Sequence, residues 1–172
     1  MSPQSCIPIK PTQEVIGWLD ESWGLNPSGK LVWIRDGRCR NIKKGSLIYQ
    51  MMEPNGYIVC RTSTNPRKKI RTHHLVWYYS TGQWPDKAID HIDNNRSNNS
   101  FNNLRLATRK ENSVNRLANK GKDLPKGVYL KKTTGKYVAM VADCYAGLHD
   151  TPEAAREAAF QLGQTIYGGF YK

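Results

Sequence analysis

Apolar residues recur along the first third of the chain with two different periods, and each period predicts a different element. Helical spacing after Thr12 is set by Val15, Ile16, Leu19 and Trp23. That spacing predicts a short helix that ends near Gly24. Runs rich in β-branched and aromatic residues follow at 31–34, 45–48 and 57–60, separated by turn signals. They predict a small antiparallel β-meander.

Helical spacing returns before residue 82. Thr72 is expected to cap a helix from His73 to about Thr81, and Gly82 stands where a left-handed cap prefers glycine. Two roles are open for His73 and His74: either side chain approaches the motif that follows, or it packs locally.

The last part of the chain predicts a hairpin and a helix. Residues 127–132 and 136–142 flank a Thr-Thr-Gly turn, and the second run alternates between two faces. Thr151 is placed to cap a helix that has Pro152 at its first position. The stripe expected to cover the sheet is Ala155, Ala158 or Ala159, Leu162 and Ile166. The whole pattern predicts an α+β fold.

Residues 90–112 fit neither period. They include seven asparagines, whose side chains hydrogen-bond nearby backbone, so this stretch is expected to contain a turn-rich loop. A short apolar run at 88–89 leads into it as a strand. Thr108 and Glu111 read as a capping box that begins a helix after it. Strand, loop and helix together allow a carboxylate, an imidazole and an amide to converge on one ion and one phosphate.

The net charge indicates what kind of partner the protein binds, and the cysteines indicate the compartment in which it acts. Lysine and arginine number 26 against 14 acidic residues, a net charge of +12. Such an excess favours a polyanionic partner, of which nucleic acid is the commonest, although solubility alone is the alternative. Four scattered cysteines show no metal-binding spacing and are expected to be reduced. With neither a signal-peptide pattern nor an apolar run long enough to span a bilayer, we expect a soluble, cytoplasmic protein.

The asparagine-rich stretch resembles the motif of HNH endonucleases of the phage and intron homing type. The matching pattern is Asp90-His91, then Asn103-Leu104-Arg105, then Thr108-x-x-Glu111-Asn112. Lead-in segments at 55–57, 73–77 and 81–85 fit the same family, so the resemblance covers most of residues 30–118. It implies a ββα-metal fold and, if phage-encoded, action in the host cytoplasm.

The resemblance also implies the site residues. Asp90 and Asn112 would bind one Mg²⁺ or Mn²⁺ ion, with no zinc expected. His91 would be the general base, and Asn103 would hold His91 in the right tautomer and stabilise the loop. An asparagine at the third motif position, as at Asn112, is a known variant.

Strand periodicity by itself separates Asp90 from His91, because neighbouring residues on a strand face opposite sides. Only a strand that ends there, or the family's local geometry, brings both to one phosphate. Asp93 is read as a turn residue rather than an extra ligand. Arg105 is read as a phosphate contact or, equally, as a structural ion pair.

The C-terminal part resembles the DNA-binding domain of plant ethylene-response factors, in which a three-stranded sheet backed by one helix reads the major groove. The matching segments are residues 127–129, 135–137, 150–155 and 167–170. Between Asp143 and His149 the chain departs from that pattern, and the third strand is expected to be cut to a few residues.

We therefore expect four regions: N-terminal DNA-binding strands at 1–71, an HNH core at 72–118, a basic linker at 119–126 and a C-terminal DNA-binding domain at 127–172. The predicted function is metal-dependent cleavage of double-stranded DNA by a monomeric homing endonuclease, as a nick or a double-strand cut. A DNA-binding protein without cleavage is the alternative, and a binder of structured RNA is a distant third. The residues expected to contact DNA are Arg35, Arg38, Arg40, Lys68, Lys69, Arg71, Arg105, Arg116, Lys120, Tyr129, Lys131, Lys132 and Lys136.

Overall fold

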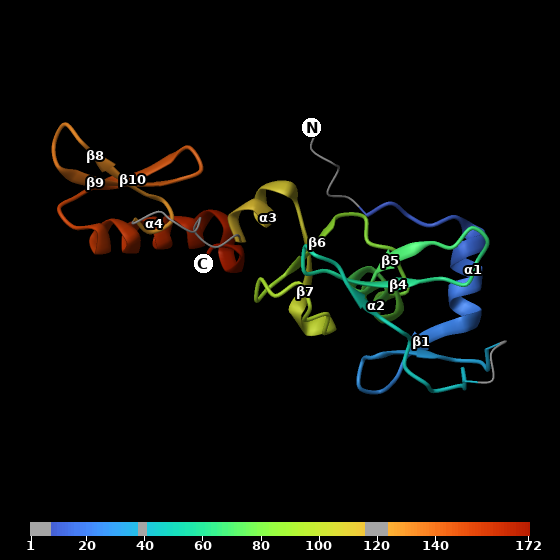
Figure 1. Cartoon of the computed structure of the whole chain (residues 1–172). Coiled ribbons are helices and arrows are strands. Elements are labelled where there is room, and N and C mark those ends of the chain that lie inside the picture. Colours follow the sequence, from blue (N-terminus) through green and yellow to red (C-terminus); the bar gives the residue numbers. More distant parts are fainter. Residues whose placement is uncertain (1–7, 38–40, 116–123) are drawn as a thin grey trace. The chain divides into compact units, whose positions relative to one another are not determined.

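The chain folds into two compact units, Met1–Thr108 and Arg109–Lys172. The computed structural model describes residues 8–37, 41–115 and 124–172. Both units combine short antiparallel sheets with helices (Figure 1), which confirms the predicted α+β class. No helix in the described ranges is both long and apolar enough to cross a membrane.

The first unit begins with helix α1 (Gln13–Ser22), followed by the antiparallel pair β1 (Trp23–Leu25) and β2 (Leu31–Trp33). The apolar stripe of α1 is buried as predicted at Val15 and Leu19. Three indole rings pack edge to face, with centroid distances of 5.1 to 6.2 Å between Trp18, Trp23 and Trp33. This aromatic cluster anchors α1 to the β1–β2 pair.

A second sheet follows in the order β3–β4–β5, formed by Met51–Met52, Ile58–Arg61 and Lys69–Arg71. Helix α2 (Thr72–Thr81) begins directly after β5. The prediction that Thr72 caps this helix is wrong: Thr72 is its first residue and Arg71 is the N-cap. The Thr72 hydroxyl contacts Gln50 Oε1 and Cys60 Sγ instead, each at 3.5 Å. Gly82 ends α2 in the left-handed region, as predicted.

The asparagine-rich stretch lies between two paired strands, β6 (Ala88–His91) and β7 (Leu104–Ala107), with a 3-10 turn η1 at Phe101–Asn103. The residue pattern predicted a strand before the loop and a helix after it, but no strand between the loop and that helix. The ββα resemblance did imply a second strand, and β7 pairs with β6 in antiparallel register.

One apolar core joins all these elements. Its buried members come from both helices, from six of the seven described strands of the unit and, at Ile48, from the segment between β2 and β3: Val15, Leu19, Trp23, Leu31, Ile48, Cys60, Ile70, Leu75, Val76, Ile89 and Leu104. The N-terminal strands and the β6–β7 pair are therefore stabilised by the same packing, so the position of β6 depends on the whole unit.

The second unit starts with α3 (Arg109–Asn115) and continues with β8 (Val128–Lys131), β9 (Lys136–Val141) and β10 (Cys144–His149). The prediction of a shortened third strand is wrong, because β10 has six residues and pairs with β9. A register shift between Tyr145 and Gly147 breaks its alternation, which hid its full length from pattern analysis.

Helix α4 (Pro152–Tyr167) backs this sheet and is followed by the turn η2 (Gly168–Phe170). The Thr151 hydroxyl accepts a hydrogen bond from Ala154 N at 3.2 Å, which confirms the predicted cap. Ala155 and Ala159 are buried as predicted, whereas Ile166 is 40% exposed. Gly163 takes the buried position further along the helix, against the ring of Tyr171.

Candidate active site

Asp90 and His91 are the last two residues of β6, and both are buried, with exposures of 6% and 4%. Every residue of β6 is buried. The strand ends at His91, and the convergence of both side chains on one phosphate stays a prediction.

Asp90 is paired across the ladder. Arg105 lies opposite it in register, and the Arg105 Nε–H donates to Asp90 Oδ2 at 2.9 Å. Of the two roles open for Arg105, the structure shows the ion pair, while contact with DNA stays a prediction. The pair fixes the orientation of a buried carboxylate at the end of the strand.

The His91 imidazole contacts residues from the loop and from α2. Its Nε2 lies 3.1 Å from Asn99 Oδ1. The His73 ring meets it edge-on, with centroids 5.0 Å apart, and the Tyr57 ring lies at 6.1 Å. The possibility that His73 approaches the site is therefore confirmed.

Asn103 organises the loop between the strands. Its Oδ1 accepts from Asp93 N at 3.1 Å, and its Nδ2 donates to Asp93 Oδ1 at 2.9 Å and to Asn98 O at 2.8 Å. This agrees with the predicted stabilisation of the loop. The side chain that contacts His91 Nε2 is that of Asn99, the neighbour of Asn98. A direct catalytic role for Asn103 stays a prediction.

Asp93 is a turn residue, as predicted. Its carboxylate accepts hydrogen bonds from Asn95 N at 2.8 Å and from Asn98 Nδ2 at 2.7 Å. Desolvation acts to raise its pKa, but hydrogen bonds from Asn98 and Asn103 outweigh it and hold the pKa below the usual value. The loop is thus built around one carboxylate.

Burial and nearby charges keep the two histidines of α2 neutral. The pKa of His73 is lowered to about 2, mainly by burial and then by the charges of His74, His91 and Arg71. The pKa of His74 is lowered to about 3 by burial, Arg71 and His91. His73 therefore contacts His91 as an uncharged ring at neutral pH.

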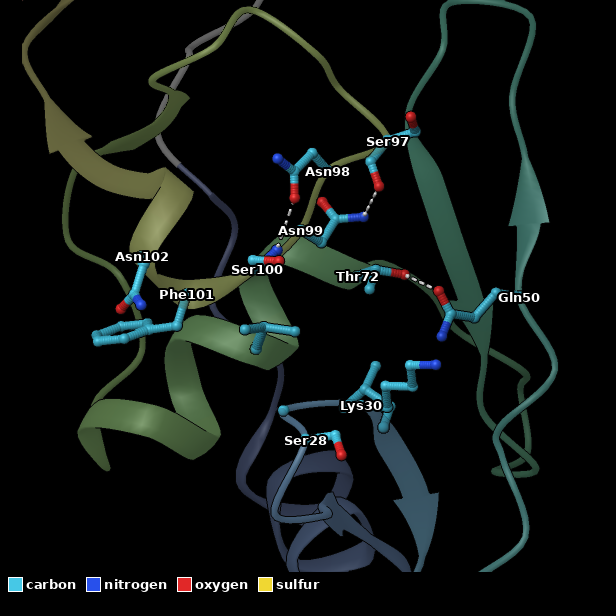
Figure 2. A pocket seen from close by; sticks show the side chains of 13 residues that line it. Ser28, Lys30, Gln50, Thr72, Ser97, Asn98, Asn99, Ser100, Phe101 and Asn102 are labelled. Atoms are coloured by element: carbon cyan, nitrogen blue, oxygen red, sulfur yellow. Dashed lines mark hydrogen bonds between the residues drawn. The ribbon is translucent and has the colours of Figure 1, made fainter.

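A hollow of about 580 Å³ opens beside the loop (Figure 2). On one side stand Asn98, Asn99 and Phe101, and on the other Lys30 and Gln50. Asn99, whose Oδ1 contacts His91 Nε2, lines this hollow, whereas His91 itself is not among the lining residues.

Asn112 lies on α3, in the second unit, and is half-buried. The two predicted ligands Asp90 and Asn112 therefore belong to different units, and their convergence on one ion stays a prediction. Within residues 8–37, 41–115 and 124–172, no cluster of three or more His, Cys, Asp or Glu side chains could hold a metal ion.

The residues expected to contact DNA fall into three groups. Arg35, Lys69 and Lys136 form ion pairs, with Glu21 at 3.6 Å, with Glu53, and with Asp150 at 2.8 Å. Four others lie outside the described residues: Arg38, Arg40, Arg116 and Lys120. Apart from Arg105, the rest are exposed: Lys68, Arg71, Tyr129, Lys131 and Lys132.

Sequence reasoning missed Asn99 and Arg96 as functional residues. Asn99 was taken only as a turn former among several asparagines, and nothing in the pattern singles it out as the contact of His91. Arg96 stands in the same run, where its Nη1 donates to Asn55 O at 2.7 Å. A lone cation in an otherwise uncharged asparagine run was the available signal.

Comparison with known proteins bears on this region. Residues 71–114 match a family model described as HNH endonuclease. The chain is 30% identical over 92 residues to a protein of Acanthamoeba polyphaga mimivirus described as an uncharacterized HNH endonuclease. That similarity covers 51% of this chain and 27% of the viral protein. No solved structure matches the chain. Residues 71–114, which include β6, β7 and His91, are thus similar to HNH endonucleases.

Proposed function

We propose that this chain is a metal-dependent DNA endonuclease that hydrolyses phosphodiester bonds at His91. The observation that carries the proposal is a buried imidazole beside a buried, oriented carboxylate at the end of β6. The match of residues 71–114 to HNH endonucleases supports DNA as the substrate.

His91 acts as the general base. Asn99 Nδ2 donates to Ser97 O at 3.3 Å, which turns Oδ1 of the same amide toward His91 Nε2. In the neutral imidazole, Nε2 then carries the hydrogen, and Nδ1 is the nitrogen that takes a proton from the attacking water. Asn99 is thus the positioning residue for the tautomer, and Asn103 supports it through Asn98.

One Mg²⁺ or Mn²⁺ ion would be held by Asp90 and Asn112. A carboxylate and an amide supply hard oxygen ligands, which suit these ions better than zinc, and two protein ligands leave positions for water and phosphate. When bound, the ion would neutralise charge that grows on the phosphate and the leaving oxygen. Arg105 keeps the Asp90 carboxylate in place for that ligand role.

As a monomer, the protein contacts double-stranded DNA, its substrate, through residues of both units. In the second unit, the exposed residues Tyr129, Lys131 and Lys132 lie on or directly after β8, on a three-stranded sheet backed by one helix. This architecture supports the proposed similarity to ethylene-response-factor domains. Recognition spread over two units suits a site-specific enzyme of the homing type.

Cleavage of supercoiled plasmid tests the proposal. We expect nicked or linear product with Mg²⁺ or Mn²⁺ and intact plasmid with EDTA. His91→Ala should lower the rate by about 10²- to 10⁴-fold, the usual worth of a general base, and Asn112→Ala should lower it as well. His149→Ala, a histidine of the second unit, is the matched control. A wild-type protein that binds DNA but leaves it intact in both metals is the non-cleaving DNA-binding protein instead.

A further inference from the structure

Two arginines from separate segments of the first unit converge on one tyrosine ring beside the candidate base. Arg71 Cζ lies 4.4 Å from the ring centroid of Tyr57, and Arg96 Cζ lies 4.9 Å from it. The Tyr57 ring in turn lies 6.1 Å from that of His91. Two positive charges therefore share one aromatic support next to the proposed reaction centre.

This arrangement is electrostatically unfavourable by itself. In the described part of the chain, neither guanidinium forms an ion pair within 4.0 Å. Arg71 influences Glu53, but the ion pair of Glu53 is with Lys69. Arg71 is also the N-cap of α2, where the helix dipole favours an anion, and the first turn has no acidic residue. An anion that contacts both guanidinium groups would relieve the repulsion.

The two side chains are held in place rather than extended freely into solvent. Arg96 Nη1 donates to the carbonyl oxygen of Asn55 at 2.7 Å. Stacking on an aromatic ring fixes a guanidinium further, and the planar group leaves its remaining N–H donors in the fork geometry that suits a phosphate. The pair is therefore preorganised for a tetrahedral oxyanion.

The same face of the sheet continues away from His91 as a basic surface. Lys69 and Arg71 are exposed and flank the buried Ile70, so both point to one side of β5. Arg61 lies opposite Lys69 in register. A hollow of about 280 Å³ at this hairpin is lined by Arg61, Arg67, Lys68 and Lys69. A row of cations that leads to a reaction centre suits a polyanionic strand better than a free anion.

We propose that Arg71 and Arg96, held against Tyr57, bind a DNA phosphate that neighbours the cleavage point at His91. The inference rests on the proposed nuclease function and adds Arg96 and Tyr57 to the residues that contact DNA. It assigns the two arginines to one shared phosphate rather than to separate solvated positions.

Binding of a random-sequence 30-base-pair duplex in EDTA, followed by fluorescence polarisation at several salt concentrations, tests this without any need for cleavage. Each lost phosphate contact makes the slope of log K against log salt shallower by about 0.9. We expect a change of that size in the Arg71→Gln, Arg96→Gln double variant, and a smaller change in either single variant, because the remaining arginine still contacts the shared phosphate. Arg156→Gln, an exposed arginine of α4, should keep the wild-type slope.

Two conservative variants separate charge from stacking. Arg96→Lys should keep the slope and weaken binding severalfold, and Tyr57→Leu should weaken binding although both charges remain. An unchanged slope in the double variant would overturn the phosphate site, and a slope shallower by about 1.8, the value for two separate contacts at about 0.9 each, would overturn sharing. Wild-type affinity for Tyr57→Leu would overturn the role of the ring. Because the duplex stays uncut, these results are independent of whether the wild type cleaves plasmid.

Discussion

At the scale of single residues, the candidate site depends on how one asparagine is oriented. Asn99 accepts from His91 on one side, and its amide donates to Ser97 O on the other. A hydrogen bond of this kind contributes about 1 kcal/mol net. In the proposed mechanism it keeps the hydrogen on Nε2 of His91, so that Nδ1 is the nitrogen that accepts the proton from water.

We therefore expect Asn99→Ala to lower the cleavage rate by about fivefold, since a loss of about 1 kcal/mol corresponds to that factor. The measurement is single-turnover plasmid nicking at saturating protein, which removes effects on DNA affinity. Asn102→Ala is the control, because Asn102 lines the same hollow and is exposed. Equal rates for the two variants would mean that Asn99 does not position His91.

Residue-scale burial also predicts a pH dependence of stability. His73 is 2% exposed, and its pKa is lowered to about 2 by burial and by neighbouring charges. The unfolded chain binds a proton near pH 6.5, whereas the folded chain does not. Stability is therefore fully present above pH 6.5 and is lost as the pH falls toward the folded pKa.

Between pH 7.5 and 5.5, this single histidine should remove about 1.4 kcal/mol from the free energy of unfolding. Urea unfolding of wild type and His73→Gln at both values measures it. The variant should lose less stability on acidification by that amount. An identical loss in both proteins would show that His73 is protonated in the folded state.

At the scale of elements, the β6–β7 pair carries the site, and its most polar cross-strand contact is the Asp90–Arg105 ion pair. Both side chains are largely buried, with exposures of 6% and 18%. Removing one partner of a buried pair leaves a charge in a poorly solvated place, which costs more than loss of a surface pair.

Arg105→Met should consequently destabilise the protein by about 3 kcal/mol. The double variant Asp90→Asn with Arg105→Met should recover part of that loss, because the buried carboxylate is gone as well. Chemical unfolding in EDTA gives both values without any contribution from a bound metal. If Arg105→Met costs under about 0.5 kcal/mol, the pair behaves as an exposed one.

Sequence reasoning located most elements of this fold, and its errors have identifiable physical causes. Helical stripes and the glycine at position 82 were clear signals because their geometry is local. β10 was predicted, but as a shorter strand than it is, and the register shift between Tyr145 and Gly147 interrupts its alternation. Thr72 was misassigned because a strand runs directly into α2, and the cap position falls on Arg71.

The site itself was predictable only in part. Asp90 and His91 stood out through motif spacing, and Asp93 through its turn signal. The contact between Asn99 and His91 depends on how the loop folds over the strand end, and neighbouring asparagines look alike in sequence. The stacking of Arg71 and Arg96 on Tyr57 joins three segments that only the tertiary fold brings together.

At the scale of the whole molecule, each of the two units has its own apolar core, and the residues of the proposed function are distributed over both. The first unit holds His91 and Asp90 on one shared core, while the second has its own core of Val128, Ala139, Val141, Ala155, Ala159 and Tyr171. A strongly positive chain with two independent cores can bind DNA through one unit and act through the other, so affinity and chemistry should be separable by mutation.

Lys131→Gln with Lys132→Gln tests that separation, because both lysines are exposed at the end of β8. If each contacts one phosphate, the salt slope of DNA binding should become shallower by about 1.8, at about 0.9 per contact. The single-turnover cleavage rate at saturating protein should stay at the wild-type value, since no group at His91 has changed. Lys10→Gln, an exposed lysine of the first unit, controls for net charge. A slower rate at saturation would show that these two lysines affect the chemical step as well as affinity, and that the two are not separable by this pair of substitutions.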